Sequence, residues 1–245
     1  MYRDQHVCAV LPARNEAPGI EQVIFDLVEL RVLDRIIVCD NGSTDDTATR
    51  AAAAGAEVVF HEIPGYGGAC LRALSEIESS DIVLFVDADN SLCIRESLGL
   101  LESIRRGADL AIGTRVKRWR EPGSMTAAQL FGNWLACRLI NLFWRYRISD
   151  LGPFRAIRYD ALNRLEMQDQ RFGWTVEMQV KAIQQDMNMV EIPVHYFKRV
   201  GHSKISGTVS GVVAAARGII GTILKLAIQP PPTRTTSSAT NESSD

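Results

Sequence analysis

Five short apolar runs in the first 115 residues constrain the fold more than any other feature of the chain. Each run ends at or near a proline, an aspartate or a glycine, and the runs cover residues 6–11, 35–39, 57–60, 81–86 and 110–112. Their apolar residues are continuous rather than alternating, which is typical of parallel strands buried on both faces of a sheet. We therefore expect five buried parallel strands.

Stretches with helical spacing separate these runs, at residues 19–30, 45–54, 68–77 and 95–106. The alternation predicts an α/β fold with a Rossmann-like, mostly parallel sheet flanked by helices. Ligands of such sheets bind beyond the carboxyl ends of the strands. The residues that directly follow each run are therefore the candidate functional residues.

The second half of the chain is less regular. Its pattern predicts helices over 127–146 and 173–185, a strand over 189–194 and an amphipathic helix over 209–228. The last residues, 229–245, are rich in Pro, Ser and Thr and are expected to be disordered. We expect one domain over 1–228, in which the regular half at 1–115 is followed by the less regular half at 116–228. No window approaches ~18 uncharged apolar residues, and the N-terminus does not read as a signal peptide, so we expect no membrane span.

Charge is divided unevenly along the chain. The net charge is −2, yet residues 1–109 hold 9 basic and 19 acidic side chains, whereas residues 110–245 hold 18 and 10. The second half is therefore expected to face an anionic partner. The five cysteines are scattered without a C-x-x-C pair, which predicts reduced packing thiols in a cytosolic protein.

Acidic residues follow three of the expected strands, namely Glu16, Asp40 and the pair Asp87 and Asp89. Two carboxylates at i and i+2 after a buried strand can hold one hard divalent cation, which can bridge two phosphate groups. Taken singly, the segment at Asp40 is equally a turn with a helix cap, and a lone D-x-D is a common solvated loop. Together, at one edge of a sheet, they predict a site for a nucleotide and a metal ion.

Several motifs occur in the order found in a known family. Residues 10–16 (VLPARNE), 39–46 (CDNGSTDD), 87–89 (DAD) and 113–115 (GTR) resemble the signatures of family 2 glycosyltransferases with the GT-A fold. Residues 150–155 (DLGPFR), 173–179 (GWTVEMQ) and 199–204 (RVGHSK) are similar to the branch of the dolichyl-phosphate mannose and glucose synthases. The resemblance covers about residues 6–228 and implies a nucleotide-sugar-binding half at 1–115 and an acceptor-binding half at 116–228.

The resemblance implies a role for each donor-site residue. The nucleoside pocket would be lined by Pro12, Arg14 and Glu16, with Asp40 on the base or ribose. Magnesium or manganese on the diphosphate would be held by Asp87 and Asp89, and a single in-line displacement would invert the anomeric carbon. One departure from the family is Ser91, which stands where the synthases often carry Gln. It either replaces that side chain near the metal or leaves a coordination position that water would fill.

We place Asp150 closest to the acceptor, although it could be a turn residue before Gly152 and Pro153. An acceptor phosphate, with a second pKa near ~6, needs no strong general base, so Asp150 would orient the acceptor or take a residual proton. Glu177 either supports this site or faces solvent. Cations expected to bind acceptor or phosphate are Arg115, Arg138, Arg199 and Lys204, although basic clusters are often only a solvated face.

The helix over 209–228 has one side that carries Arg217 and Lys225 and an apolar remainder. This suits a helix in an anionic membrane interface, but a helix packed on the protein's own core would show the same pattern. The aromatic residues Trp134, Phe143 and Trp144 are a second candidate membrane contact, or else core residues. Residues 65–68 (GYGG) lack a phosphate-loop pattern and predict a glycine turn that opens a helix.

The sequence therefore predicts an inverting, metal-dependent hexosyltransferase. It would move a hexose from UDP-glucose or GDP-mannose to a polyprenyl or dolichyl phosphate, as a peripheral protein on the cytoplasmic face of the membrane. No nucleic-acid partner is expected, and the sequence leaves the oligomeric state open. Two alternatives remain: a transferase with a soluble or glycolipid acceptor, and a non-catalytic nucleotide-sugar binding protein.

Overall fold

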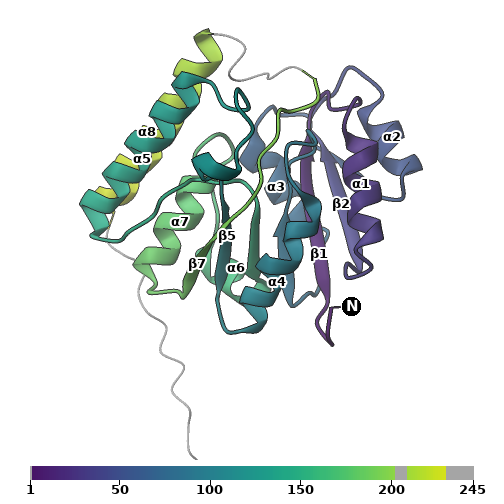
Figure 1. The fold of residues 1–245 in the computed structure, drawn as a ribbon, viewed down its shortest axis with the longest axis horizontal. Helices are drawn as coiled ribbons and strands as arrows, with labels where there is room; N and C mark the ends of the chain where they lie inside the picture. Colours follow the sequence, from purple (N-terminus) through teal and green to yellow (C-terminus); the bar gives the residue numbers. More distant parts are fainter. Residues whose placement is uncertain (1, 202–208, 230–245) are drawn as a thin grey trace, which may run out of the picture.

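The computed structural model describes residues 2–201 and 209–229, and its centre is a seven-stranded sheet (Figure 1). The strands, in chain order, are β1 (Val7–Ala13), β2 (Arg35–Asp40), β3 (Glu57–Phe60), β4 (Ile82–Phe85), β5 (Leu110–Thr114), β6 (Arg155–Arg158) and β7 (Met189–Pro193). They are arranged in the order β3-β2-β1-β4-β6-β5-β7. The expected mostly parallel α/β architecture is confirmed, because β6 alone of these strands runs against its neighbours.

Strand β6 is the part of the sheet that the sequence pattern misses. It lies antiparallel between β4 and β5, with Ala156 paired to both Leu84 and Ala111. Its four residues include an arginine at each end, so it shows no continuous apolar run. The expectation of a buried strand at 57–60 is wrong, because β3 is an edge strand with Glu57 and Phe60 exposed.

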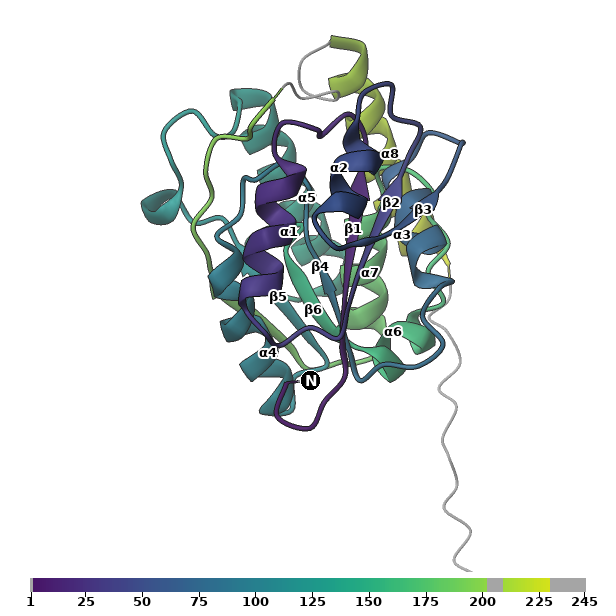
Figure 2. The ribbon, with the colours of Figure 1, turned by 90° about the vertical axis from the view of Figure 1, so that its right-hand side faces the viewer.

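Helices cover both faces of the sheet (Figure 2). One face carries α1 (Ile20–Glu29), α2 (Thr47–Ala53) and α4 (Ser97–Arg105), and the other carries α3 (Tyr66–Leu74), α6 (Tyr159–Leu165) and α7 (Trp174–Gln184). Short 3₁₀ turns at Ile94–Glu96 and Lys117–Trp119 precede α4 and follow β5. Helix α6 is the other element absent from the sequence prediction.

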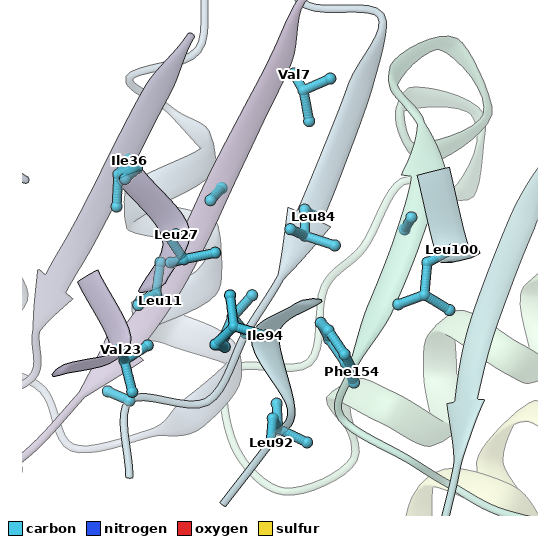
Figure 3. Close-up of a cluster of buried hydrophobic side chains, with 14 of the residues drawn as sticks. Val7, Leu11, Val23, Leu27, Ile36, Leu84, Leu92, Ile94, Leu100 and Phe154 are labelled. Atoms are coloured by element: carbon cyan, nitrogen blue, oxygen red, sulfur yellow. The ribbon is translucent and has the colours of Figure 1, made fainter. Parts of the chain in front are cut away.

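Alternation along the strands divides the core between the two faces. In β1, Val7 and Leu11 meet Val23 and Leu27 of α1 in the cluster drawn in Figure 3, whereas Val10 joins the cluster on the opposite face. Burying one such side chain contributes roughly 1.5–3 kcal/mol. The two clusters hold the strand ends rigidly, which fixes where the loops after β1, β2 and β4 emerge.

A third layer lies outside α7. It consists of α5 (Ala127–Trp144), which begins with a capping box between Thr126 and Gln129, and α8 (Val209–Ile228), which lies beside α5 (Figure 1). Buried Ile223 and Leu226 of α8 join a cluster with residues of α5 and α7. One side of α8 therefore packs on the protein's own core. No helix within the described parts of the chain is long and apolar enough to cross a membrane.

The five cysteines are free thiols, and four of them are buried. This confirms their expected role as packing residues. The expected disordered tail lies almost wholly outside the described residues, as does Lys204.

Candidate active site

The loops that follow β1 and β2 are joined by hydrogen bonds. Asn15 has a left-handed backbone with φ 52°, and its Oδ1 accepts from the Thr44 amide at 2.7 Å while its own amide donates to Ser43 Oγ at 2.9 Å. One residue later the Glu16 amide donates to Thr47 Oγ1 at 2.8 Å. Residues from both predicted donor motifs thus form one surface at the carboxyl edge of the sheet, where we expected a nucleotide.

Asp40 has one oxygen engaged and one unpaired. Its Oδ1 accepts from the Ser43 amide at 2.8 Å, as in the turn that was the alternative reading of this segment. Its Oδ2 is buried and accepts no hydrogen bond from the residues that the structure describes. A buried carboxylate oxygen without a donor is costly. This oxygen therefore fits a ligand that brings a hydroxyl or N–H group, as a nucleoside does.

Asn41 is a site residue that the sequence reasoning missed. Its side-chain amide donates to the carbonyls of His61 and Ile63, both at 2.8 Å, and its Oδ1 accepts from the Gly65 amide at 2.7 Å. It therefore fixes the loop between β3 and α3 against the end of β2. Its position directly after Asp40, at a strand end, was the available signal.

Asp87 and Asp89 follow β4 and are each held by a neighbouring side chain. The Tyr66 hydroxyl donates to Asp87 Oδ1 at 3.1 Å. The amide of Ser91 donates to Asp89 Oδ1 at 3.1 Å, and its buried hydroxyl donates to the same oxygen. Ser91 thus braces Asp89, which neither sequence-based reading of Ser91 anticipated.

The charge of this pair suits a divalent cation. Burial, reinforced by the charge of Asp89, raises the pKa of Asp87 to about 7. No group of three or more His, Cys, Asp or Glu side chains within the described residues could hold a metal by itself. Two carboxylates that leave further places to phosphate oxygens and water are a usual Mg²⁺ arrangement. The residues present therefore fit a cation that is bound together with a diphosphate.

Arg199 reaches the donor residues from the segment that follows β7. Its Nη2 lies 3.0 Å from Glu16 Oε1 and 3.0 Å from Asp89 Oδ2. The segment is fixed by the Val200 amide, which donates to the Asp89 carbonyl at 2.9 Å, and by the Phe197 amide, which donates to the Ser91 carbonyl at 2.8 Å. Arg199, expected to bind acceptor or phosphate, is thus placed at the predicted metal-binding carboxylate.

Asp150 and Arg115 form a buried, two-pronged ion pair. Arg115 donates through Nε to Asp150 Oδ2 at 2.9 Å and through Nη2 to Oδ1 at 2.7 Å, and its amide donates to Oδ2 at 2.7 Å. Burial by itself raises the pKa of Asp150, but the charge and hydrogen bonds of Arg115 outweigh burial and lower it. The guanidinium also lies 5.3 Å from the centre of the Tyr196 ring. Asp150 is therefore an ionised carboxylate that Arg115 holds in place.

A buried arginine supports this part of the site. Arg155 of β6 donates to the Gly152 carbonyl at 2.7 Å and to Gln179 Oε1 at 2.9 Å, and Gln179 in turn donates to the Asp150 carbonyl at 3.0 Å. Burial lowers the pKa of Arg155 to about 10. Gly152 permits this turn, because a Cβ there would lie 2.1 Å from the Gly113 carbonyl oxygen. Sequence reasoning had assigned no role to Arg155, although it ends the quoted 150–155 motif.

The residues expected to bind acceptor or phosphate do not form one cluster. Glu177, expected either to support the acceptor site or to face solvent, is buried, pairs with Lys181 at 2.8 Å and accepts from the amides of Gln168 and Asp169, so the solvent-facing alternative is wrong. Its bonds brace the loop before α7. Arg138 lies exposed on α5.

At the donor side, Pro12 is half-buried at the end of β1 and Arg14 is exposed beside it.

The loop braced by Glu177 packs against the start of α3. The amides of Gly67 and Gly68 donate to the carbonyls of Arg171 and Gln170, at 3.1 and 2.9 Å. A Cβ at Gly67 would lie 1.9 Å from the Asp169 carbonyl oxygen. The glycine turn predicted to open a helix is confirmed, and its glycines are required by this close approach. The same contact fixes Tyr66 where its hydroxyl meets Asp87.

We predict that Tyr66→Phe weakens Mn²⁺ binding in the presence of a nucleoside diphosphate by about 3- to 10-fold, because a net hydrogen bond is worth roughly 0.5–1.5 kcal/mol. The hydroxyl fixes Asp87 Oδ1 and thereby orients the other oxygen. Calorimetry with Mn²⁺ and UDP or GDP measures the effect. Tyr159→Phe, which removes a hydroxyl bound to the Ile77 carbonyl, is the matched control. Equal affinities of the Tyr66 variant and the wild type would contradict the assignment.

Comparisons with known proteins agree with this geometry. A model of the family described as glycosyl transferase family 2 matches residues 8–165. The chain belongs to glycosyl transferase family 2. An uncharacterised glycosyltransferase of Mycobacterium tuberculosis is 35% identical over 217 residues, which cover 85% of this chain and 94% of that protein. A dolichyl-phosphate hexose transferase of Haloferax volcanii is 25% identical over 225 residues, covering 91% and 96%.

Solved structures of similar proteins have the same architecture. Glucosyl-3-phosphoglycerate synthase of Mycobacterium tuberculosis, in complex with Mn²⁺, UDP and phosphoglyceric acid, superimposes with a TM-score of 0.73 at 23% identity. The match covers 93% of this chain and 80% of that one. This family 2 glycosyltransferase therefore has the GT-A fold that the motif order implied.

Proposed function

We propose that this family 2 glycosyltransferase moves a hexose from a nucleoside diphosphate sugar to a polyprenyl phosphate at a membrane surface, with inversion at the anomeric carbon. The observation that carries the lipid acceptor is an apolar and basic surface on the two outer helices, here called the α5/α8 surface. It consists of Phe131, Trp134, Arg138 and Leu142 of α5, Arg145 directly after α5, and Arg217, Leu224, Lys225 and Ile228 of α8.

The exposed side of α5 has the composition of a membrane-interface helix. Phe131, Trp134, Arg138, Leu142 and Arg145 recur at intervals of three or four residues, so they form one stripe. Leu142 is 71% exposed, Phe131 61% and Trp134 55%. Exposed apolar side chains gathered on one stripe indicate an interaction surface, and alternating arginines suit anionic head groups.

Charge favours a bilayer over a second protein as the partner. Residues 122–149 and 192–241 contain no Asp or Glu, whereas both outer helices carry exposed cations. Each Lys or Arg near an anionic leaflet contributes about 1 kcal/mol of attraction. Two copies of this chain that met through the same surface would instead place like charges together.

Helix α5 is also tied to the segment that carries Asp150. Asn141 of α5 exchanges hydrogen bonds with Ile148, at 2.9 and 3.2 Å, and Asn133 Oδ1 accepts from the Leu151 amide at 2.9 Å. A phosphate head group entering from lipid at α5 would thus lie near the candidate acceptor residue. This link supports a lipid acceptor over a soluble one.

In the proposed reaction an oxygen of the acceptor phosphate attacks the anomeric carbon. The bond from that carbon to the diphosphate oxygen breaks, and the diphosphate leaves with the electron pair. A divalent cation at Asp87 and Asp89 would supply positive charge at the leaving diphosphate. Asp150 has a lowered pKa and both oxygens paired with Arg115, so its role is to hold Arg115 and orient the acceptor; a dianionic phosphate requires no base.

A soluble phosphorylated acceptor is the second candidate. Glucosyl-3-phosphoglycerate synthase, which has a similar fold, was solved with phosphoglyceric acid. The buried Arg115 and the donor site would serve either acceptor, since both present a phosphate. The α5/α8 surface distinguishes the two, because a soluble acceptor gives it no role.

The experiment supplies labelled UDP-glucose or GDP-mannose with Mn²⁺ and offers short polyprenyl phosphate in anionic vesicles, or 3-phosphoglycerate in solution. We expect label in the lipid. The double variant Phe131→Ser, Leu142→Ser should bind vesicles at least about 100-fold more weakly, because two apolar side chains of roughly 1.5–3 kcal/mol each are lost. Phe25→Ser, at a position on α1 that is 51% exposed, is the control. Label only in the soluble product would refute the lipid acceptor.

A further inference from the structure

The contact between Arg199 and the donor site has a consequence beyond phosphate binding. One nitrogen of the guanidinium lies 3.0 Å from both Glu16 Oε1 and Asp89 Oδ2, so a positive charge already stands between two donor-site carboxylates. Glu16 and Asp89 are buried, at 7% and 5% exposed. Bulk water therefore reaches the two carboxylates little, whereas the Arg199 side chain is 30% exposed.

We propose that Arg199 is a resident counter-cation that controls the order of binding: it excludes a free divalent cation from Asp89 and admits the cation together with a nucleoside diphosphate. The inference rests on the metal site of the proposed function and goes beyond it. It assigns Arg199 a role in the ligand-free protein, in addition to any role on phosphate.

The competition follows from charge. A Mn²⁺ ion on Asp89 Oδ2 would stand beside a guanidinium that binds the same oxygen, and the two cations repel each other. A nucleoside diphosphate offsets the repulsion between the two cations, because its phosphate oxygens attract the metal ion and the guanidinium alike. Free metal and Arg199 therefore compete, whereas metal, diphosphate and Arg199 are compatible.

Arg199 retains a donor for that second state. Its Nε is buried and has no hydrogen-bond partner among the described residues. A buried N–H without an acceptor is costly, so the observed pairing does not satisfy the guanidinium fully. Phosphate oxygens beside Asp89 would supply the missing acceptor.

The Arg199 side chain can move away from Asp89 while the segment that carries it stays in place. Behind this segment lies a groove of about 740 Å³ between α1 and the start of α4, and Phe197, Lys198 and Val200 line its near side. Phe197 and Val200 are 41% and 38% exposed. The backbone of this segment is held in place, since the amides of Phe197 and Val200 donate to the carbonyls of Ser91 and Asp89 and the Lys198 amide donates to Glu121 Oε2 at 2.8 Å. The Arg199 side chain is 30% exposed, so it is the guanidinium that can be drawn from Asp89.

The test measures Mn²⁺ binding to the full chain by calorimetry and by the electron paramagnetic resonance of unbound Mn²⁺, with and without UDP or GDP. Without nucleotide, Arg199→Gln should bind Mn²⁺ about 10-fold more tightly than the wild type, since a neighbouring unit charge changes the cation affinity of a carboxylate by 10-fold or more. With nucleotide the gain should disappear or reverse. Lys198→Gln, which removes the adjacent cation paired with Glu121, should leave Mn²⁺ binding unchanged.

Equal or weaker Mn²⁺ binding by Arg199→Gln without nucleotide would overturn the inference while leaving the metal site intact. If the wild type failed to bind Mn²⁺ with UDP and also with GDP, the proposed metal site would be contradicted, and the inference with it. Circular dichroism of each variant shows whether the fold is retained. Arg199→Lys, which restores a charge on a different side chain, should return Mn²⁺ affinity toward the wild-type value.

Discussion

Asp89→Asn is expected to lower hexose transfer by about 10³-fold or more while leaving the fold intact. The asparagine keeps the shape of the side chain, and its Oδ1 can still accept from the Ser91 amide and hydroxyl. It loses the charge that would hold a divalent cation on the leaving diphosphate. Removing one preorganised electrostatic group of this kind typically costs 10²–10³-fold in turnover, and losing the metal costs more.

The measurement is the initial rate of label transfer at saturating Mn²⁺, together with the melting temperature of each protein. Asp160→Asn removes a carboxylate of α6 that is exposed and pairs with Arg158 and Arg164, so it should leave the rate unchanged. A wild-type rate in Asp89→Asn with a correct fold would show that Asp89 does not hold a required metal.

Asp150→Asn is expected to lower the free energy of unfolding by about 3–5 kcal/mol, since it leaves the buried guanidinium of Arg115 without its counter-charge. For a chain of this size, such a loss corresponds to a fall of roughly 10 °C in melting temperature. Chemical denaturation at pH 7 measures it. A double variant, Arg115→Met with Asp150→Leu, removes both charges and should recover much of the loss. A loss below about 1 kcal/mol in the single variant would contradict the assignment of a structural pair.

The same pair predicts a pH dependence with a definite sign. The pKa of Asp150 is lower in the folded protein than in the unfolded chain, so its contribution to stability is fully present above the ordinary aspartate pKa of about 3.9. The contribution disappears as the pH falls through the folded pKa. The stability difference between wild type and Asp150→Asn should therefore shrink below about pH 4.

Most of the sheet and the donor half of the site could be predicted from the sequence. Continuous apolar runs are a local signal, and the carboxyl ends of parallel strands meet at one edge, so Asp40, Asp87 and Asp89 could be assigned to one site without coordinates. Strand β6 could not be predicted, because its four residues begin and end with arginine and show neither a continuous apolar run nor an alternating pattern. Its place between β4 and β5 depends on long-range pairing.

The arrangement of the acceptor half of the candidate site could not be predicted, because it depends on contacts between residues far apart in the chain. Arg115 and Asp150 are 35 residues apart and Arg199 and Glu16 are 183 apart, and composition carries no information on which cation meets which carboxylate. Arg115, Arg138, Arg199 and Glu177 therefore looked alike as candidate phosphate or acceptor residues. In the structure Arg115 lies in an ion pair with Asp150, Arg138 lies on an exposed stripe, Arg199 contacts the carboxylate proposed to bind metal, and Glu177 supports a loop.

By itself, the sequence determined the family, the order of strands and helices in the first half, and which residues end the strands, because each follows from local periodicity or motif order. Only the tertiary structure decided that α8 rests on α5 and α7 by one side, that Ser91 and Tyr66 brace the two aspartates, and that Arg199 stands against Asp89. Apart from the local contact of Ser91 with Asp89, these contacts join distant segments, and the free energy that selects them comes from packing and charge pairing in the folded chain.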